Sequence, residues 1–181
     1  MVGFFFAGKH SLDFKNVVMA YAQRGLRPSI RRNDYEISGR DGTVDFGEET
    51  FDTHPIPINI YLLGTDENNL RELAREVAFW LSGKGSLRFD DEPHREHDAA
   101  VYNSIDAEQF FNAKRATVTF ECQPFAKSIN FLQSVNPGIP PGFVANISSE
   151  GTQRTPARIT LRNTGNTTIT NLTVSRRALR R

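Results

Sequence analysis

The sequence predicts an α+β fold: a mainly antiparallel β-sheet, built as a sandwich or a split-barrel-like domain, with one α-helix packed on it. Two observations lead to this prediction. A helical period of apolar residues occurs once, whereas short runs rich in β-branched and aromatic residues recur along the chain. These runs lie at residues 14–21, 30–37, 56–63, 86–89, 99–105 and 116–124. A single helix among several strands does not fit a βαβ repeat, in which helices alternate with parallel strands.

The helix is predicted over residues 68–81. Apolar residues recur there at the i, i+3, i+4 spacing, which is typical of a helix with one buried face. Thr65 or Asp66 can cap the first amides, and Gly83 fits the position just after the C-terminus. Off the apolar stripe, like charges repeat four residues apart, as in Glu72 and Glu76. We interpret that side of the helix as a solvated face.

The last of the six predicted strands shows the clearest alternation. Val118, Phe120 and Cys122 alternate with polar residues, which is typical of a half-buried strand. This pattern places Cys122 in the core, where a cysteine behaves as a small hydrophobic residue and not as a reactive thiol.

Charge and composition divide the chain into two parts. Residues 1–149 contain 15 Lys and Arg against 20 Asp and Glu, whereas residues 150–181 contain seven Arg and one acidic residue. A stretch with three prolines and two glycines, residues 135–143, has the composition of a linker or a rigid corner. We therefore predict a first domain at 1–134, a linker at 135–145 and an incomplete unit at 146–181.

Within this last unit, two strands are predicted at 156–161 and 167–174. They flank the sequence Asn-Thr-Gly-Asn at 163–166, which is a good hairpin turn. The pair indicates either an isolated β-hairpin or the beginning of a β-sandwich. A piece of roughly 40 residues or fewer rarely buries enough surface to fold without a partner.

Composition excludes several classes of protein. The balance of 22 Lys and Arg against 21 Asp and Glu argues against nucleic-acid binding by the chain as a whole. A single cysteine excludes a disulfide framework and a four-cysteine zinc site. No apolar run approaches the roughly 18 residues of a membrane span, and residues 1–8 lack the basic start of a signal peptide. We interpret the sequons at Asn146, Asn166 and Asn171 as chance occurrences in a protein made in the cytoplasm.

One cluster of potential metal ligands occurs between two predicted strands. His94 and His97 lie three residues apart among acidic neighbours. Those neighbours are Asp90, Asp91, Glu92, Glu96 and Asp98. The spacing matches no zinc-protease motif, and Pro93 disfavours a helix that would present both histidines from one face. A polar turn is favoured over a metal site.

No other pattern indicates catalysis. Nucleophile elbows, P-loops and dinucleotide-binding glycine motifs are absent from the sequence. An acidic loop, formed by Asp41, Asp45, Glu48, Glu49 and Asp52, does not have the spacing of an EF-hand. We therefore predict no catalytic residue, no cofactor site and no metal ligand, and a protein that is not an enzyme.

Basic residues cluster at the end of the chain, at Arg176, Arg177, Arg180 and Arg181. No aromatic residue is interleaved with them, so the cluster lacks the stacking groups of a single-strand nucleic-acid site. A solvated tail is favoured, and a contact with the acidic body of a neighbouring subunit is the alternative.

The order of the motifs resembles a known family. A strand at 58–62 is followed by a helix that ends in Phe-Trp-Leu at 79–81. Leu-Arg-Phe-Asp-Asp-Glu-Pro follows at 87–93, and Thr-Phe-Glu-Cys-Gln-Pro-Phe at 119–125. Over about residues 14–128 this order resembles the distal tail proteins of long-tailed phages, the siphophage tail components.

The resemblance implies a structural virion protein. Its first domain would form a hexameric ring that joins the tail tube to the tail-tip or baseplate proteins and to the receptor-binding apparatus. It would be assembled in the cytoplasm of the bacterial host, and its second domain would be the start of a galectin-like β-sandwich. The acidic cluster at 90–93 would then be a structural corner of the ring domain.

Two other functions are kept as alternatives. A carbohydrate- or host-surface-binding module would use the second unit, although residues 144–181 contain no Phe, Tyr or Trp on which a sugar could stack. A metal-dependent hydrolase would use His94, His97 and the nearby acidic residues.

Overall fold

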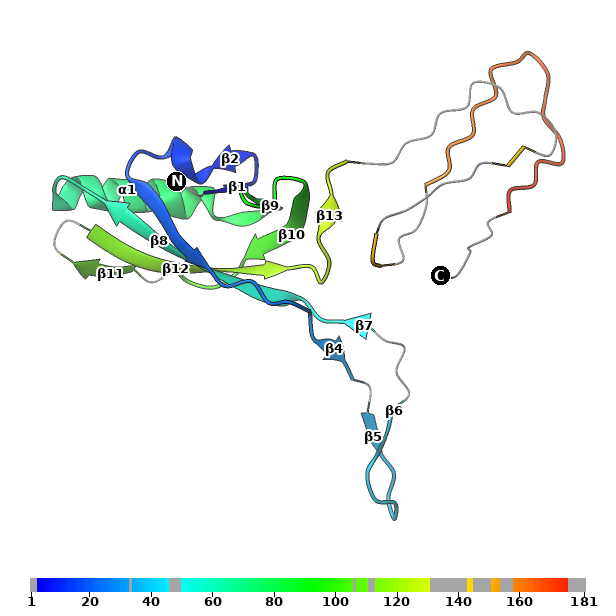
Figure 1. Ribbon diagram of the computed structural model, residues 1–181, viewed down its shortest axis with the longest axis horizontal. Coiled ribbons are helices and arrows are strands. Elements are labelled where there is room, and N and C mark those ends of the chain that lie inside the picture. Colours follow the sequence, from blue (N-terminus) through cyan, green and yellow to red (C-terminus); the bar gives the residue numbers. More distant parts are fainter. Residues whose placement is uncertain are drawn as a thin grey trace. The chain divides into compact units, whose positions relative to one another are not determined.

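The computed structural model describes residues 3–32, 34–45, 50–105, 107–110, 113–130, 143–144, 151–153 and 158–175. The chain divides into two compact units, Met1–Phe131 and Leu132–Arg181. The first unit contains the helix and strands described below (Figure 1).

A nine-stranded antiparallel sheet forms the centre of the first unit. In spatial order its main path is β2 (Lys9–His10), β1 (Phe4–Phe6), β9 (Gly83–Phe89), β10 (Arg95–Val101), β12 (Ala113–Cys122), β8 (His54–Leu63) and β3 (Val17–Ala22). Two further strands join this path, because β11 (Ala107–Phe110) pairs with β12 and β13 (Lys127–Ser128) pairs with β10. The register brings Val118 opposite Ile58 and Phe120 opposite Ile56, so apolar residues of β12 and β8 share one face.

Helix α1 (Glu67–Trp80) lies over a face of this sheet (Figure 1). Asp66 caps it, because its side chain accepts a hydrogen bond of 2.9 Å from the backbone amide of Asn69. At the other end the backbone amide of Leu81 donates to the carbonyl of Val77, 2.9 Å away. The helix ends one residue earlier than predicted, with Leu81 as the C-cap. Gly83, whose φ is +98°, is therefore the second residue after the C-cap and not the first.

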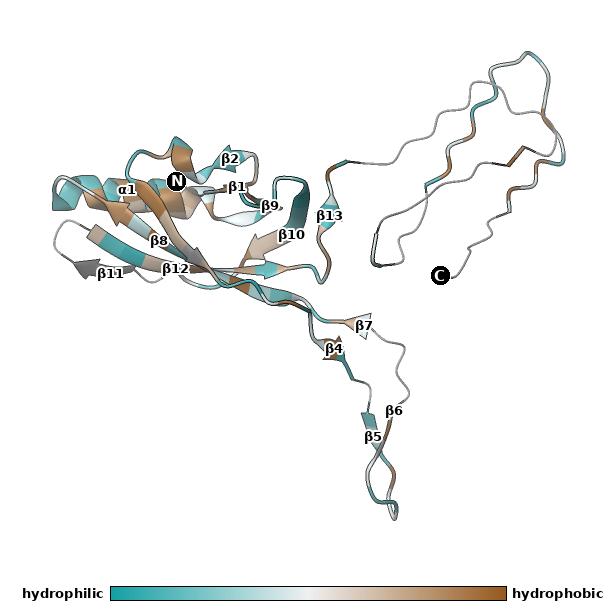
Figure 2. Cartoon of the chain, in the orientation of Figure 1, coloured by the Kyte–Doolittle hydropathy of each residue, from teal (hydrophilic) through white to brown (hydrophobic). Residues whose placement is uncertain are grey.

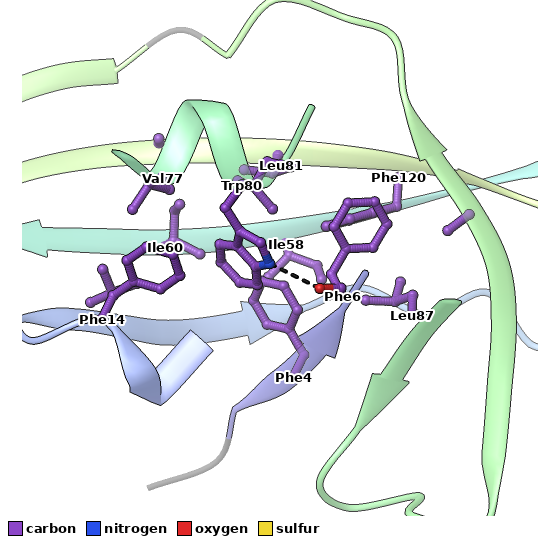
Figure 3. Close-up of a cluster of buried hydrophobic side chains, with 14 of the residues drawn as sticks. Phe4, Phe6, Phe14, Ile58, Ile60, Val77, Trp80, Leu81, Leu87 and Phe120 are labelled. Atoms are coloured by element: carbon purple, nitrogen blue, oxygen red, sulfur yellow. Dashed lines mark hydrogen bonds between the residues drawn. The ribbon is translucent and has the colours of Figure 1, made fainter. Parts of the chain in front are cut away.

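Aromatic rings fill the space between the helix and the sheet (Figure 3). Trp80 stacks on Phe4 with 5.4 Å between ring centroids, and it also contacts Phe14 at 4.8 Å. Phe120 packs edge-on against Phe4 and Phe6. The buried indole of Trp80 donates a hydrogen bond of 2.9 Å to the carbonyl of Phe6. This bond pairs the one polar atom that the tryptophan carries into the core.

The N-terminal strand β1 was not predicted from the sequence. Phe4 and Phe6 are completely buried, and β1 pairs with both β2 and β9. Ala7 and Gly8 connect β1 to β2, and both have positive φ values, of 49° and 83°. Such a turn suits a tight hairpin, but Ala-Gly is a weak hairpin signal compared with Asn-Gly, so the sequence does not reveal it.

The α+β class, with a mainly antiparallel sheet and one helix in the described residues, is confirmed. The bounds of all six predicted strands differ from those in the structure, and the differences in three of them have a clear cause. The run 14–21 begins at Val17, because residues 11–13 form a short 3₁₀ helix, η1. The run 30–37 is divided into β4 (Ile30–Arg31) and β5 (Asp34–Glu36). The run 99–105 becomes β10 (Arg95–Val101), because β10 pairs with β9 back to His97 and with β13 at Arg95 and Glu96.

In the described part of the second unit, the predicted turn is present and the residues of the predicted strands are not in strands. The side chain of Asn163 accepts a hydrogen bond from the amide of Gly165 at 3.0 Å and donates one to the carbonyl of Thr167 at 2.9 Å. Residues 158–161 and 167–174 are not in strands, and their side chains are exposed. The physical reason is that these residues bury no apolar face against a neighbour. The predicted start of a galectin-like sandwich therefore stays a prediction, as do the predicted domain limits.

Candidate functional site

The most distinctive feature of the first unit is an arm, defined here as residues 24–32, 34–45 and 50–51, in the connection between β3 and β8. It contains two short antiparallel ladders, one between β4 and β7 (Thr50–Phe51) and one between β5 and β6 (Thr43–Asp45). Each is a separate two-stranded sheet and not part of the nine-stranded sheet. Figure 1 shows the arm extending away from the sheet at the point where β3 ends and β8 begins.

The tip of the arm is a tight turn that glycine makes possible. The backbone amide of Arg40 donates to the carbonyl of Ile37 at 3.1 Å. Gly39 and Gly42 have φ values of +82° and +80°, which other residues rarely adopt. The segment Ser38–Gly42, which contains both glycines, is therefore the turn between β5 and β6.

The arm exposes apolar side chains to solvent. Leu26 is fully exposed, and Ile30, Ile37 and Tyr35 are also exposed, Tyr35 by 62%. Hydrophobic and hydrophilic segments alternate along the arm in Figure 2. Two-stranded ribbons are marginally stable in water unless their apolar residues pack against something else. Exposed apolar side chains on a projecting ribbon are typical of a surface that binds another protein.

The root of the arm is attached to the acidic corner, defined here as residues 90–93, between β9 and β10. The guanidinium of Arg24 forms ion pairs with Asp91 and with Glu92, the second at 3.2 Å. It also lies over the ring of Phe89, 4.8 Å from the centroid. Next to it, the backbone amide of Gln23 donates to the carbonyl of Pro57 at 3.0 Å. These contacts fix the direction in which the chain enters the arm.

The corner also contacts the N-terminal segment, through Asp90. Asp90 accepts a hydrogen bond of 2.7 Å from the amide of Gly3 and lies 2.9 Å from the imidazole of His10. Burial alone would raise the pKa of the Asp90 carboxyl, but the bonds from His10 and Gly3 outweigh it and hold this pKa below its ordinary value. Three of the carboxylates that the sequence offers as metal ligands, Asp90, Asp91 and Glu92, thus bind side chains and an amide of the chain itself.

The structure separates the two histidines of the predicted cluster. His94 is exposed in the turn, whereas His97 is half-buried in β10. Among the described residues, no three His, Cys, Asp or Glu side chains are grouped in a way that could hold a metal ion. The ring beside His97 belongs instead to His54, at 5.9 Å between centroids. The sequence does not reveal this pair, because 43 positions separate the two residues and only the sheet register brings them together.

Cys122 lies in the core, as its strand pattern predicts. It is free and completely buried. Burial raises the pKa of its thiol to about 12, with a further increase from the neighbouring charge of Glu121. Its thiol is therefore protonated at neutral pH, and Cys122 is not a nucleophile in this fold.

Other predicted features lie partly outside the described residues. These features are Glu48 and Glu49 of the acidic loop, most of the linker at 135–145, the sequon at Asn146 and the arginine cluster at 176–181. Of the rest of the acidic loop, Asp52 pairs with Arg31 at 2.7 Å. Within the part of the chain that is described, no helix has the length and apolar character needed to cross a bilayer.

Comparison with known proteins agrees with these observations. A family model described as the phage tail protein RIFT-related domain matches residues 18–122, more than half of the chain. A search of curated proteins finds no match. The fold is similar to the crystal structure of the Dit protein of phage SPP1, described as a paradigm of the hub adsorption apparatus in phages that infect Gram-positive bacteria. That similarity has a TM-score of 0.61 and 20% sequence identity.

A helix-covered antiparallel sheet is the fold that this chain shares with the SPP1 Dit protein. The chain belongs to the phage tail protein family that carries the RIFT-related domain. It is therefore a component of the virion, and the resemblance to siphophage tail proteins predicted from the sequence is confirmed. The structural similarity covers 71% of this chain and 52% of SPP1 Dit, so this chain spans about half the length of that protein.

Proposed function

We propose that this chain is a subunit of the distal tail hub, a non-enzymatic ring that joins the tail tube to the tail-tip or baseplate proteins and the receptor-binding apparatus. The ring would be hexameric, a stoichiometry that rests on the family resemblance. Its subunits would assemble in the cytoplasm of the bacterial host. The similarity of the fold to SPP1 Dit, a hub protein, supports this role.

The observation that carries the proposal is the arm. A subunit closes into a ring when one of its surfaces binds a different surface of the next copy, in a head-to-tail contact. The arm extends beyond the sheet that forms the core and exposes Leu26, Ile30 and Ile37. Burial of such side chains on a neighbouring copy would stabilise both the arm and the contact, at roughly 25 cal/mol for each Å² of apolar surface buried.

The root of the arm supports the same proposal. Arg24 is held by two carboxylates of the corner, and the paired rings of Phe51 and Phe125, 4.9 Å apart, hold the returning chain. Both ends of the arm are therefore fixed to the body, which lowers the conformational entropy that the arm would lose on binding. A fixed root also gives successive subunits the same rotation, as ring closure requires.

Native mass spectrometry and negative-stain imaging over a range of protein concentrations test the proposal. We expect a closed oligomer that dissociates on dilution. The double variant Leu26→Asp/Ile37→Asp should remain monomeric at concentrations at which the wild type assembles, because it places charges in the proposed contact.

The control is Tyr102→Asp, which places a charge at an exposed aromatic residue outside the arm. It should assemble like the wild type. A wild-type chain that stays monomeric at the highest concentration, with purified tail-tube protein added, would overturn the ring. Assembly by the arm variant at wild-type concentrations would show that the arm is not the contact.

A further inference from the structure

Two histidines meet at the root of the arm. The arm has a first limb, which contains β4 and β5, and a second limb, which contains β6 and β7. The histidines lie where the second limb leads into the nine-stranded sheet. His54 is the first residue of β8 and follows β7 by three positions, whereas His97 lies in β10. Their rings are 5.9 Å apart and nearly perpendicular, at 72°. The sheet register explains the contact: His54 is opposite Cys122, and Ala99, two residues after His97, is opposite Cys122 on its other side.

The environment of both rings favours their neutral form. The Nδ1 atoms of His54 and His97 are buried, and neither has a hydrogen-bond partner among the described residues. An imidazolium would carry a proton on each nitrogen, so it would have an unpaired N–H donor at this buried position. Two imidazolium rings at this distance would also repel each other.

We propose that His54 and His97 form a pH-sensitive latch, which holds the second limb of the arm against β10 while both rings are neutral and loosens it when they are protonated, with the Phe51–Phe125 ring pair still attaching it to the body. The latch is a property of the single chain, and it does not depend on ring formation. It goes beyond the structural role of the arm because it makes the position of the arm respond to acid.

The surrounding charges act on the two rings in different ways. Burial lowers the pKa of His54, and Glu121 of β12 partly offsets this effect. Burial also lowers the pKa of His97, and His54, Arg24 and Arg95 lower it further, whereas Glu92 of the corner raises it. These are the charged groups that act on the pair from β12, β10, the corner and the start of the arm. Their sum leaves both pKa values below the ordinary value of 6.5.

The direction of the response follows from these lowered values. In the released arm the rings would be hydrated and would titrate near the ordinary pKa of about 6.5. The released form therefore binds more protons than the latched form once the pH falls below that value. The latch is undisturbed above about pH 7 and weakens progressively as the pH falls from about 6.5 toward the lowered pKa values.

The first limb of the arm does not share this response. Among the ion pairs of the described residues, those of Arg24 are with Asp91 and Glu92 and involve no histidine. Protonation of the histidines therefore loosens the limb that His54 holds and leaves the Arg24 end attached. We therefore expect the arm to sample more positions relative to the body while it stays attached at Arg24. The nine-stranded sheet should not change.

Distances between two spin labels can test the latch in the full chain. Ser38→Cys places one label at the tip of the arm and Glu72→Cys places the other on the exposed face of α1. The native Cys122 is buried, and its thiol pKa of about 12 keeps it unlabelled. Diluting the labelled chain into unlabelled chain restricts the measurement to distances within one subunit. We expect the distance distribution to broaden between about pH 7.5 and about pH 5.5.

The decisive variant is His54→Phe/His97→Phe, which retains an aromatic edge-to-face pair but cannot titrate. Its distance distribution should be the same at both pH values. His94→Gln removes the exposed neighbouring histidine, and His10→Gln removes the histidine that pairs with Asp90; both should broaden in acid like the wild type. A wild-type distribution that does not change with pH overturns the latch, and so does broadening of the double Phe variant.

Nuclear magnetic resonance of the imidazole groups gives a second measurement if the double variant does not fold. The wild-type His54 and His97 signals should titrate below the ordinary value, and backbone amides of residues 50–54 should shift over the same pH range. Histidines that titrate at or above 6.5, or amides of the second limb that do not follow them, would overturn the proposal.

Discussion

The body sheet and the arm use the same antiparallel pairing, but they differ in what lies on their faces. In the body, Ile58, Val118 and Phe120 are completely buried beneath a helix. In the arm, two short ladders leave Leu26 and Ile37 exposed. Backbone hydrogen bonds therefore do not by themselves distinguish a stable sheet from a marginal one. Burial of side chains does.

This difference shows how one chain can separate stability from binding. The buried core, in which aromatic rings pack among aliphatic side chains, stabilises the body. The arm depends on its root, where Arg24 and the Phe51–Phe125 pair attach it to the body. Changes in the core should therefore act on unfolding, whereas changes in the arm should act on its mobility and on assembly.

Truncation of a core ring should have the largest effect. Phe120→Ala removes the ring that contacts both Phe4 and Phe6 and leaves a cavity that the surrounding sheet can fill only in part. We expect the free energy of unfolding to fall by about 3–5 kcal/mol, measured by urea denaturation.

The control is Phe79→Ala. It makes the same substitution at a phenylalanine whose side chain is 84% exposed. Its effect should stay within about 0.5 kcal/mol. Similar losses for the two variants would show that the core is not built around Phe120.

The body could be predicted well because its patterns are local. The alternation in β12 and the stripe in α1 follow from periods that a single window of sequence contains. Strand β1 was missed because Phe4, Phe5 and Phe6 form a continuous apolar run without a period. The strands predicted in the second unit were wrong for residues 158–161 and 167–174, since β-propensity stabilises a strand only when a partner buries one of its faces.

The candidate site was less accessible to prediction, because it depends on contacts between distant residues. Arg24 and Asp91 are 67 positions apart, and nothing in the composition of either segment indicates that they pair. The acidic corner was singled out correctly as a structural turn, although its cationic partners were not identified. His94 and His97 were considered together because they are neighbours in sequence, whereas the sheet places His97 beside His54.

Release of the first limb of the arm should have an intermediate effect. Arg24→Gln removes both ion pairs with the corner, and the side chains involved are partly exposed. We therefore expect a loss of about 1 kcal/mol or less in the free energy of unfolding. Hydrogen–deuterium exchange should nevertheless become faster in peptides from the arm, because the ends of the ladders would open more often.

Arg71→Gln is the matched control for this change. It removes the 2.5 Å ion pair with Glu67 on the exposed face of α1, which is worth about 0.3–0.5 kcal/mol. Exchange in the arm should not change in this variant. If Arg24→Gln leaves exchange in the arm at the wild-type rate, the corner does not anchor the arm.

The smallest effect on stability should come from the surface of the arm itself, and it gives the sharpest test of the comparison. Tyr35 in the arm and Tyr102 in the body are the same residue type at similar exposures, 62% and 67%. Substitution of either by Ser should change the free energy of unfolding by no more than about 0.5 kcal/mol, because neither ring is in the core.

Assembly should distinguish the two variants. Tyr35→Ser should raise the dissociation constant of the oligomer about tenfold or more, as loss of a buried interfacial tyrosine does. Tyr102→Ser should leave this constant unchanged. Sedimentation velocity over a concentration series measures both constants. Equal weakening by the two variants would mean that exposed tyrosines contribute to association wherever they lie, and the arm would then have no special part in it. A loss of unfolding free energy in Tyr35→Ser comparable to that of Phe120→Ala would instead make the arm part of the cooperative core, and the separation of stability from binding would be wrong.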